Sequence, residues 1–163
     1  MLHMQHNEPM TTDATPPIAD ELSREIAQNC VLTRTRQISR VLTAVYDQEM
    51  RPFGLNATQF SMLALVLEFG PISRSELGRR NHQDRSTLTR NLQPLVEQEL
   101  VAEQVPPGGG RRRPLTLTPQ GHAILHRAAP GWSSAQTKAK ELLGDEGARA
   151  LMGIAGGLPR RKD

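Results

Sequence analysis

Apolar residues recur every three or four positions between Leu22 and Tyr46, the spacing of one face of an α-helix. No glycine or proline interrupts the pattern before Pro52. We therefore expect one long helix from about Asp20 to about Met50. A helix of this length exceeds what a small domain needs for its own core. Dimerisation through this helix is one explanation for the excess.

Two shorter helices are predicted after a turn at residues 51–55. Asn56 is suited to cap the first of them, which ends at Gly70. Ser73 caps the second, a short helix over residues 74–80 with Leu77 as its buried anchor. Residues 81–83 then form a loop. The apolar stripe of the first helix consists of Phe60, Leu63, Ala64 and Leu67.

Asp84 is suited to cap a fourth helix, expected over residues 85–100, with two chemically different faces. Pro94 lacks a backbone donor and should bend this helix near Arg90. On a helical wheel, the apolar side consists of Leu88, Leu92, Leu95 and Val96. The opposite, exposed side consists of Ser86, Thr89, Arg90 and Gln93.

A β-hairpin is predicted next, from two short alternating segments at residues 101–105 and 115–117. Val101 and Val105 are its apolar positions, and Glu103 faces outward. The segment between the strands is a run of prolines and glycines followed by three consecutive arginines, Arg111, Arg112 and Arg113. The tip of the hairpin is therefore basic.

The last third of the chain is predicted to be helical. Thr118 caps a fifth helix with Pro119 in its first turn. Residues 130–131, Pro-Gly, break or bend it, and the helical pattern resumes over residues 132–143. Gly144 separates a final helix whose apolar side is Leu151, Ile154 and Leu158. We expect residues 1–19 to form a disordered tail and residues 159–163 to form a charged tail.

These elements predict a mainly α fold with a small β-hairpin wing. A winged helix-turn-helix covers residues 51–118, and residues 20–50 and 119–158 supply N- and C-terminal dimerisation helices. A helix fits the major groove of DNA, where each base pair shows a distinct donor and acceptor pattern. A basic wing suits the phosphate backbone or the minor groove. The alternative is a solvated helix face beside a solvated basic hairpin.

The distribution of charge along the chain supports DNA binding more than the net charge does. The 163 residues carry a net charge of only +3. Residues 1–33 hold one arginine and five acids, whereas residues 74–113 hold eight arginines and five acids. Arginine suits bidentate contact with phosphate, although a high genomic G+C content gives the same arginine excess. The middle of the chain is therefore expected to be a basic surface.

Several other functions find no support in the sequence. The single cysteine excludes an internal disulfide framework and a multi-cysteine zinc site. His122 and His126 have metal-binding spacing but no acidic residue close by. We expect no metal, no cofactor and no enzymatic activity, since paired catalytic carboxylates and a phosphate-cradling loop are both missing. With no signal segment and no long apolar run, we expect a cytoplasmic protein without a membrane partner.

Four stretches of the sequence resemble a known family. They are residues 55–63, LNATQFSML; Leu77 before the turn; residues 84–92, DRSTLTRNL; and residues 117–121, LTPQG. Together they resemble the MarR family of bacterial winged helix-turn-helix transcription regulators, over about residues 28–158. Residues 84–92 are the most specific part of this match.

The resemblance implies a homodimer in which each subunit presents one recognition helix and one wing to double-stranded DNA. We expect a sequence-specific regulator, in the first instance a repressor, that binds a near-palindromic operator and is released by a small-molecule ligand. Arg111 matches the family's wing-tip arginine, but Gly109 stands where the family commonly has an aspartate. Arg112 can therefore share its role. The recognition-helix positions carry over to Arg85, Ser86, Thr87, Thr89 and Arg90.

Two further residues suggest how the regulator senses its signal. Some members of the family respond to oxidants through a cysteine in the first helix, and Arg34 lies one turn after Cys30. Cys30 also lies on the apolar stripe, where a free cysteine is an ordinary buried residue. Trp132 is a candidate for lining a ligand crevice between the dimer helices and the DNA-binding head. A winged-helix module that binds a protein partner remains an alternative of a different class.

Overall fold

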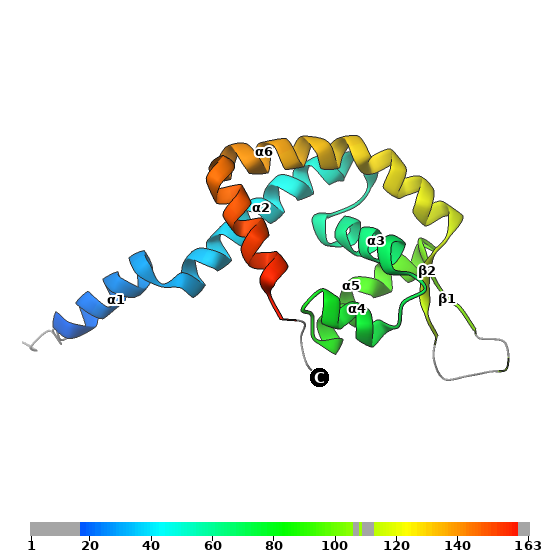
Figure 1. The fold of residues 1–163 in the computed structure, drawn as a ribbon, viewed down its shortest axis with the longest axis horizontal. Helices are drawn as coiled ribbons and strands as arrows, with labels where there is room; N and C mark the ends of the chain where they lie inside the picture. The colour runs from blue at the N-terminus through cyan, green and yellow to red at the C-terminus, as the bar shows by residue number, and fades with distance from the viewer. Residues whose placement is uncertain (1–16, 106–107, 109–112, 160–163) are drawn as a thin grey trace, which may run out of the picture. The chain divides into compact units, whose positions relative to one another are not determined.

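The computed structural model describes residues 17–105, 108 and 113–159 (Figure 1). Two units can be distinguished, Met1–Arg40 and Val41–Asp163, and α2 runs across their boundary. No helix in the described ranges is long and apolar enough to cross a bilayer. In chain order the elements are α1 Pro17–Asn29, α2 Val31–Met50, the 3-10 helix η1 Arg51–Phe53, α3 Ala57–Phe69, α4 Arg74–Arg80, α5 Arg85–Glu97, β1 Val101–Glu103, β2 Leu115–Leu117 and α6 Pro119–Gly157.

The first unit does not contain the uninterrupted helix that the sequence predicts. The helix begins earlier, at Pro17, so the predicted tail is wrong for residues 17–19, and it stops at Asn29 before α2 starts at Val31. The guanidinium of Arg34 donates hydrogen bonds to the carbonyl oxygen of Gln28, over 3.0 Å from Nε and 2.9 Å from Nη2. In a continuous helix that carbonyl would accept from the backbone four residues later. The side chain of Arg34 thus replaces a helical hydrogen bond.

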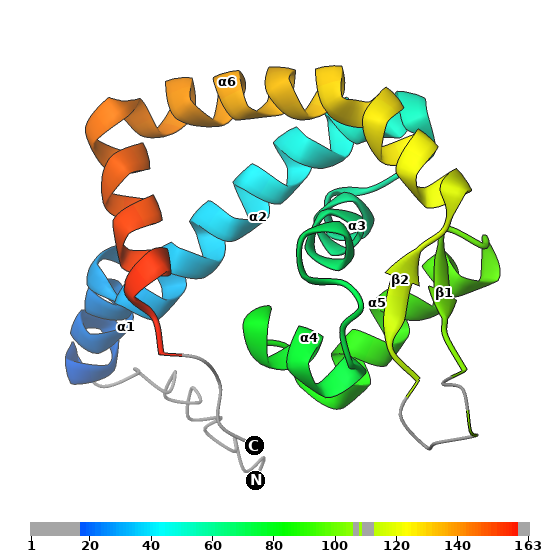
Figure 2. The ribbon, with the colours of Figure 1, turned by 45° about the vertical axis from the view of Figure 1, so that its right-hand side comes forward.

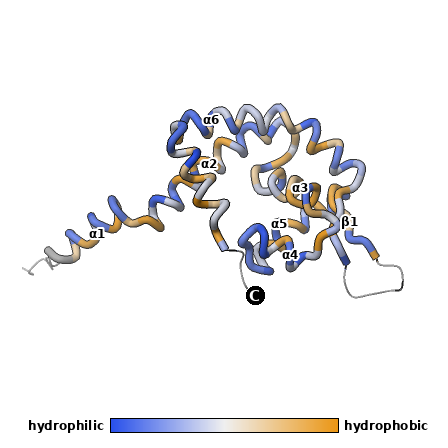
Figure 3. Tube along the Cα trace, in the orientation of Figure 1, coloured by the Kyte–Doolittle hydropathy of each residue, from blue (hydrophilic) through white to orange (hydrophobic). Residues whose placement is uncertain are grey.

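The core of the second unit lies between α3, α4, α5 and the two strands. Hydrophobic residues run along α3 (Figure 3). Leu77 of α4 is fully buried, and Leu88, Leu92 and Leu95 of α5 lie in the same cluster. The predicted buried side of the fourth helix is therefore confirmed. The helix ends at Glu97 rather than at Leu100 and continues through Pro94.

The four predicted helix caps are confirmed. Asn56 accepts a hydrogen bond from the backbone of Gln59, whose side chain accepts in return from the backbone of Asn56. Ser73, Asp84 and Thr118 each accept from the backbone three residues later. These side chains satisfy amide groups that have no partner inside the helix.

The apolar stripe predicted for α3 is wrong in part. The buried residues of this helix are Met62, Leu63 and Val66, whereas Leu67 is 48% exposed. The helix is apolar on most of its circumference, so periodicity alone does not identify the side that faces the core.

The hairpin has the predicted antiparallel pairing, with Val101 opposite Leu117. The first strand is shorter than predicted, ending at Glu103, whereas the second has the predicted bounds. Val105 is 67% exposed rather than a packing position. Leu115 forms a further bridge to Ile72, which joins the hairpin to the segment before α4. The wing is thereby attached to the helix-turn-helix through its backbone.

A single long helix, α6, replaces the two helices predicted on either side of Pro130. Gly131 is buried where α6 meets the end of α2, and a Cβ there would lie 2.7 Å from the carbonyl oxygen of Glu49. Glycine at this position permits close helix packing rather than a break. The separation at Gly144 is confirmed, since its φ of 68° and ψ of 161° are not helical. Figure 2 shows the resulting bend in α6.

The element order confirms the predicted fold class, a mainly α winged helix-turn-helix with a small β-hairpin. The helix-turn-helix consists of α4, the turn at residues 81–84 and α5, and the hairpin follows directly.

Candidate nucleic-acid interface

The helix α5 presents a polar face because its apolar face is fixed in the core. Leu88, Leu92 and Leu95 are at most 3% exposed, so the rotation of the helix about its axis is determined. Arg90 is exposed as a result, and so are three neighbouring polar residues, Ser86, Thr89 and Gln93; Arg85, the first residue of the helix, is exposed as well. Thr87, which we predicted to contact DNA with them, is only half-exposed.

The arginines of α4 are held by acidic residues or by an aromatic ring. Arg79 and Arg80 both form ion pairs with Glu76, at 2.7 Å and 2.8 Å. The guanidinium of Arg80 also lies 4.2 Å from the ring centroid of Phe69, a cation–π contact. Arg80 therefore packs within the second unit.

The described arginines of α5 and of the wing, unlike those of α4, have no acidic partner in the described part of the chain. Neither Arg85 nor Arg90 forms an ion pair with any residue in the described part of the chain, and both are exposed. Arg113, at the base of the wing, is likewise exposed and has no acidic partner among the described residues. An unpaired, exposed guanidinium can bind phosphate or a guanine edge without first breaking an internal ion pair.

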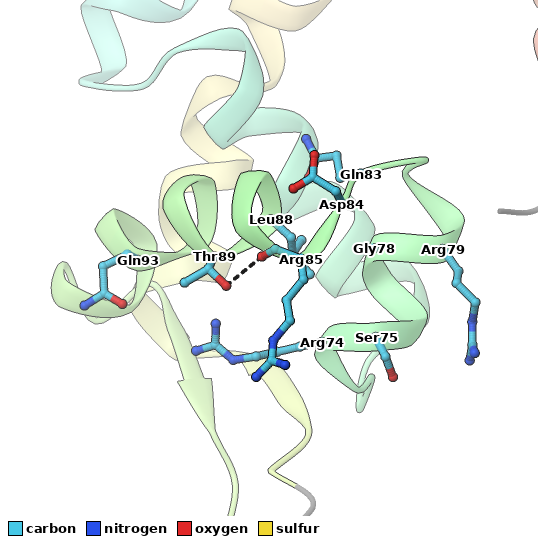
Figure 4. Close-up of a pocket in the computed structure, with 10 residues that line it drawn as sticks. All are labelled: Arg74, Ser75, Gly78, Arg79, Gln83, Asp84, Arg85, Leu88, Thr89 and Gln93. Carbon is cyan, nitrogen blue, oxygen red and sulfur yellow. Dashed lines mark hydrogen bonds between the residues drawn. The ribbon is translucent and has the colours of Figure 1, made fainter. Parts of the chain in front are cut away.

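A hollow of about 740 Å³ lies between α4 and α5 (Figure 4). Arg74 and Arg85 extend into this region from the two helices, with Thr89 beside them. The hollow therefore combines guanidinium groups with a hydroxyl on the face where α5 is exposed. Its chemistry suits an anionic surface such as a nucleic-acid backbone.

The base of the wing is joined to α4 by an ion pair. Arg74 donates from Nε to Oε1 of Glu103 at 2.7 Å, and its Nη2 contacts the same oxygen. Glu103 was predicted to face outward, but its side chain is only 24% exposed because it meets Arg74. Arg111 and Arg112, the other predicted wing contacts, lie outside the described residues.

A second hollow, of about 660 Å³, contains the predicted ligand-site residue Trp132. Its walls come from α2, α3 and α6, and Tyr46, Phe60 and Phe69 contribute three further aromatic rings. Tyr46 donates its hydroxyl proton to Gln136 at 2.5 Å, which ties α2 to α6, and burial raises the pKa of this phenol. The rings of the hollow come from positions far apart in the sequence.

Cys30 lies directly before the first residue of α2 and is half-exposed. Hydrogen bonds from the backbone N–H and the hydroxyl of Thr33 lower the pKa of the thiol. The predicted source of positive charge, Arg34, instead bonds to Gln28 and Gln37. The features that favour the thiolate are thus the helix N-terminus and Thr33 rather than Arg34.

No group of three or more potential metal ligands occurs within the ranges that the structure describes. His122 and His126 are both exposed on α6. Sequence reasoning missed the link between Arg74 and Glu103, which are 29 positions apart. It also missed the bonds of Asp84 to Ser86 and Thr87, for which the spacing Asp-x-Ser-Thr after a loop was an available signal.

Comparison with known proteins agrees with this architecture. Residues 53–112 match a sequence model of the MarR family. The crystal structure of the transcriptional regulator MosR from M. tuberculosis is 36% identical, with 80% of this chain and 93% of MosR covered and a TM-score of 0.68. MosR in complex with DNA is 32% identical, with 78% and 95% covered and a TM-score of 0.66.

A curated relative is the HTH-type transcriptional repressor NicR of Pseudomonas putida, 31% identical over 88 residues. The match covers 54% of this chain and 56% of NicR, so it spans little more than half of that repressor. The family model, the two MosR structures and the winged helix-turn-helix agree with one another. The chain belongs to the MarR family of DNA-binding transcription regulators.

Proposed function

We propose that this chain is a cytoplasmic transcriptional repressor that binds a near-palindromic operator in double-stranded DNA as a homodimer. A small-molecule ligand releases it from that operator. The observation that carries DNA recognition is the exposed face of α5, on which Arg85 and Arg90 have no acidic partner in the described part of the chain. MosR, to which this chain is similar with a TM-score of 0.66, has been solved with DNA.

Each element of the interface has a distinct role in this proposal. Arg90 and the polar residues of α5 contact base edges in the major groove, where bidentate arginine–guanine pairs give discrimination. Arg113, together with Arg111 and Arg112, contacts phosphates or the minor groove and contributes affinity that depends on salt. The ion pair between Arg74 and Glu103 keeps the wing oriented toward α5.

The homodimer is supported by apolar side chains that a single chain leaves exposed. In the first unit, Leu22 and Val31 are 58% and 80% exposed. From residue 142 to the C-cap of α6, four apolar residues are more than half exposed: Leu142, Met152, Ile154 and Leu158. Exposed apolar residues at both ends of a chain mark interaction surfaces. A second copy that covers them would also supply the second recognition helix for a twofold operator.

The hollow around Trp132 is the proposed ligand site. Its volume falls within the usual range for small-molecule pockets, and its four aromatic rings favour a small, mostly apolar ligand. Because its walls come from α2, α3 and α6, a bound ligand would change how the scaffold helices hold the DNA-binding head. Such a ligand acts only through different affinities for the DNA-bound and free states.

A thiol-based response is a second candidate for the input signal, favoured by the hydrogen bonds from Thr33 that lower the pKa of Cys30. Oxidation would then replace ligand binding as the release signal. Peroxide should release operator DNA from the wild type but not from Cys30→Ser. Release that persists in the Cys30→Ser variant would eliminate this candidate.

The main test is selection of binding sites from a random duplex library by the full chain, followed by competition with DNA from upstream of its own gene. The proposal predicts one enriched near-palindrome and loss of its retention in the Arg85→Ala/Arg90→Ala variant. The matched control is Arg127→Ala, which removes an exposed arginine from α6. If no duplex is retained at low salt, DNA recognition is wrong and a protein-binding winged helix explains the chain better.

The ligand proposal has its own direct readout, because Trp132 is the single tryptophan of the chain. A small aromatic compound that releases operator DNA should also change the fluorescence of Trp132. Release of DNA without any change in tryptophan emission would place the ligand elsewhere.

A further inference from the structure

The hydroxyl groups of Ser86 and Thr87, in the first turn of α5, both donate to the side chain of Asp84. Oγ of Ser86 lies 2.6 Å from Oδ1 of Asp84, and Oγ1 of Thr87 lies 2.8 Å from Oδ2 of the same side chain. An ionised carboxylate can only accept hydrogen bonds, so both hydroxyls must donate. Each has one proton, which leaves an oxygen that can only accept from any further partner.

The third hydroxyl on this face, that of Thr89, also donates its proton within the protein. Oγ1 of Thr89 donates to the carbonyl oxygen of Arg85 at 2.8 Å, drawn as the dashed line in Figure 4. A carbonyl, like a carboxylate, only accepts. The start of α5 therefore combines guanidinium groups that only donate with hydroxyl groups that present acceptors.

The charge of Asp84 keeps this arrangement in place at neutral pH. The hydroxyl of Ser86, followed by the backbone N–H and the hydroxyl of Thr87, holds the pKa of this carboxyl well below its usual range. The same carboxylate caps α5 by accepting from the backbone N–H of Thr87 at 2.8 Å. One side chain thus caps the helix and directs two hydroxyl protons away from an approaching partner.

Phosphate oxygens are acceptors and cannot bond to a hydroxyl oxygen that has only lone pairs to offer. In the major groove, the groups that can donate are the exocyclic amino groups of adenine and cytosine, whereas guanine and thymine present a carbonyl at the corresponding position. An acceptor-only hydroxyl therefore distinguishes adenine from guanine, or cytosine from thymine, on the strand that it touches.

We infer that Asp84 is a specificity-determining positioning residue, which holds Ser86 and Thr87 as acceptors so that α5 selects a base with an exocyclic amino group. The inference rests on the proposed function, because it requires α5 to lie in the major groove. Asp84 itself need not touch DNA. It acts through the hydroxyls, while Arg85 and Arg90 supply the donors for guanine or phosphate.

The Asp84→Asn variant tests this directly, because asparagine is as good a helix cap as aspartate. Its amide oxygen can keep the bonds that Oδ1 now makes, which places the amide NH₂ against the hydroxyl of Thr87. That hydroxyl must then accept a hydrogen bond from the amide, which leaves its own O–H free to donate to a partner outside the protein. The polarity of one contact is reversed while the fold is retained.

The experiment determines base preferences for the wild type and Asp84→Asn by selection from the same random duplex library. We expect preference at one position of each half-site to shift from the amino-bearing base to the carbonyl-bearing base, by roughly five- to tenfold. Asn56→Asp is the matched control, since it exchanges the same two groups at the cap of α3 and should leave every preference unchanged. Preference profiles of Asp84→Asn and of Ser86→Ala that are both identical to that of the wild type would overturn the inference, whatever happens to overall affinity.

Two further measurements keep the inference testable if Asp84→Asn does not fold. Ser86→Ala and Thr87→Val each remove one hydroxyl, and at least one of them should abolish the amino-over-carbonyl preference at one position. Replacing the selected adenine by unsubstituted purine, or the selected cytosine by a pyrimidinone without the amino group, should weaken wild-type binding about equally. The inference is wrong if neither hydroxyl substitution alters any base preference.

These outcomes separate the inference from the function on which it rests. If the wild type enriches no sequence at all, the proposed DNA recognition fails. If it enriches an operator but the hydroxyls and Asp84 do not affect base choice, only the present inference fails.

Discussion

Arg74, at the start of α4, donates a hydrogen bond from Nε to Oε1 of Glu103, at the end of β1, over 2.7 Å. The two residues are 29 positions apart, and their side chains are 35% and 24% exposed. This ion pair joins the wing to the helix-turn-helix at the point where the hairpin leaves the core. Gly109 stands where the family commonly has an orienting aspartate, so we predict that the direction of the wing is held by this ion pair at its base.

We predict that Glu103→Gln weakens operator binding about fivefold, equivalent to about 1 kcal/mol, because the wing loses an orienting contact. The free energy of unfolding should fall by no more than about 1 kcal/mol, since the pair is partly exposed. Operator titration and thermal unfolding measure the two effects. Equal affinities for the wild type and Glu103→Gln would show that the pair does not orient the wing.

The helix and the wing should differ in what they contribute to binding. Arg90→Ala is expected to cost about 1–3 kcal/mol on the selected operator and little on unrelated DNA, because it removes a base contact. Arg113→Ala should weaken binding to both kinds of DNA similarly and lower the slope of log affinity against log salt by about one. Titrations on specific and scrambled duplexes at several salt concentrations distinguish these effects. Indistinguishable behaviour of the two variants would contradict this division of roles.

Close packing against the backbone of Leu100 explains why residues 117–121, LTPQG, end in a glycine, Gly121. A Cβ at this position would lie 2.0 Å from the carbonyl oxygen of Leu100, a backbone atom that cannot easily move aside. Gly121→Ala should therefore lower the free energy of unfolding by about 1–3 kcal/mol. Gly153→Ala in the same helix is the control, since a Cβ there meets nothing within 4 Å and alanine favours the helix. Denaturation at one protein concentration should give opposite signs for the two variants, and a neutral Gly121→Ala would refute the packing explanation.

The thiol of Cys30 should react at lower pH than an ordinary cysteine. Its pKa is lowered by the backbone N–H and hydroxyl of Thr33, so the thiolate is populated at a pH where a free thiol, with a pKa of about 8.5, remains protonated. The rate of iodoacetamide labelling against pH should rise and level off earlier than for a reference peptide. Thr33→Val should move the midpoint upward, since the hydroxyl bond is lost while the backbone bond remains. A profile that coincides with the reference peptide would contradict the lowered pKa.

The sequence predicts most of the helix-turn-helix because its signals are local. Caps such as Asn56 and Asp84 lie within three residues of the groups they satisfy, and the leucine spacing of α5 identifies its buried side. The errors arise where a distant residue decides the outcome. Gly131 packs against α2 instead of breaking α6, and Glu103 turns toward Arg74 instead of solvent.

In the candidate site, too, the local features were predictable from the sequence and those that depend on side-chain geometry or distant residues were not. Arg90 is exposed as predicted, because its position follows from the helical wheel, and Arg85 is exposed at the first residue of α5. The reduced exposure of Thr87 and the bonds of its hydroxyl to Asp84 depend on side-chain geometry that residue spacing does not specify. The aromatic hollow joins Tyr46 to Trp132 across three helices, and only Trp132 was identified from the sequence.

The central claim is that two copies of this chain place two α5 helices in successive major grooves on one face of the DNA. Hydroxyl-radical footprinting on the selected operator tests it most directly. We predict two protected segments related by twofold symmetry, with centres about 10 base pairs apart, and loss of both in the Arg85→Ala/Arg90→Ala variant. A single unsymmetrical footprint, or a symmetrical one that survives in that variant, would contradict the account.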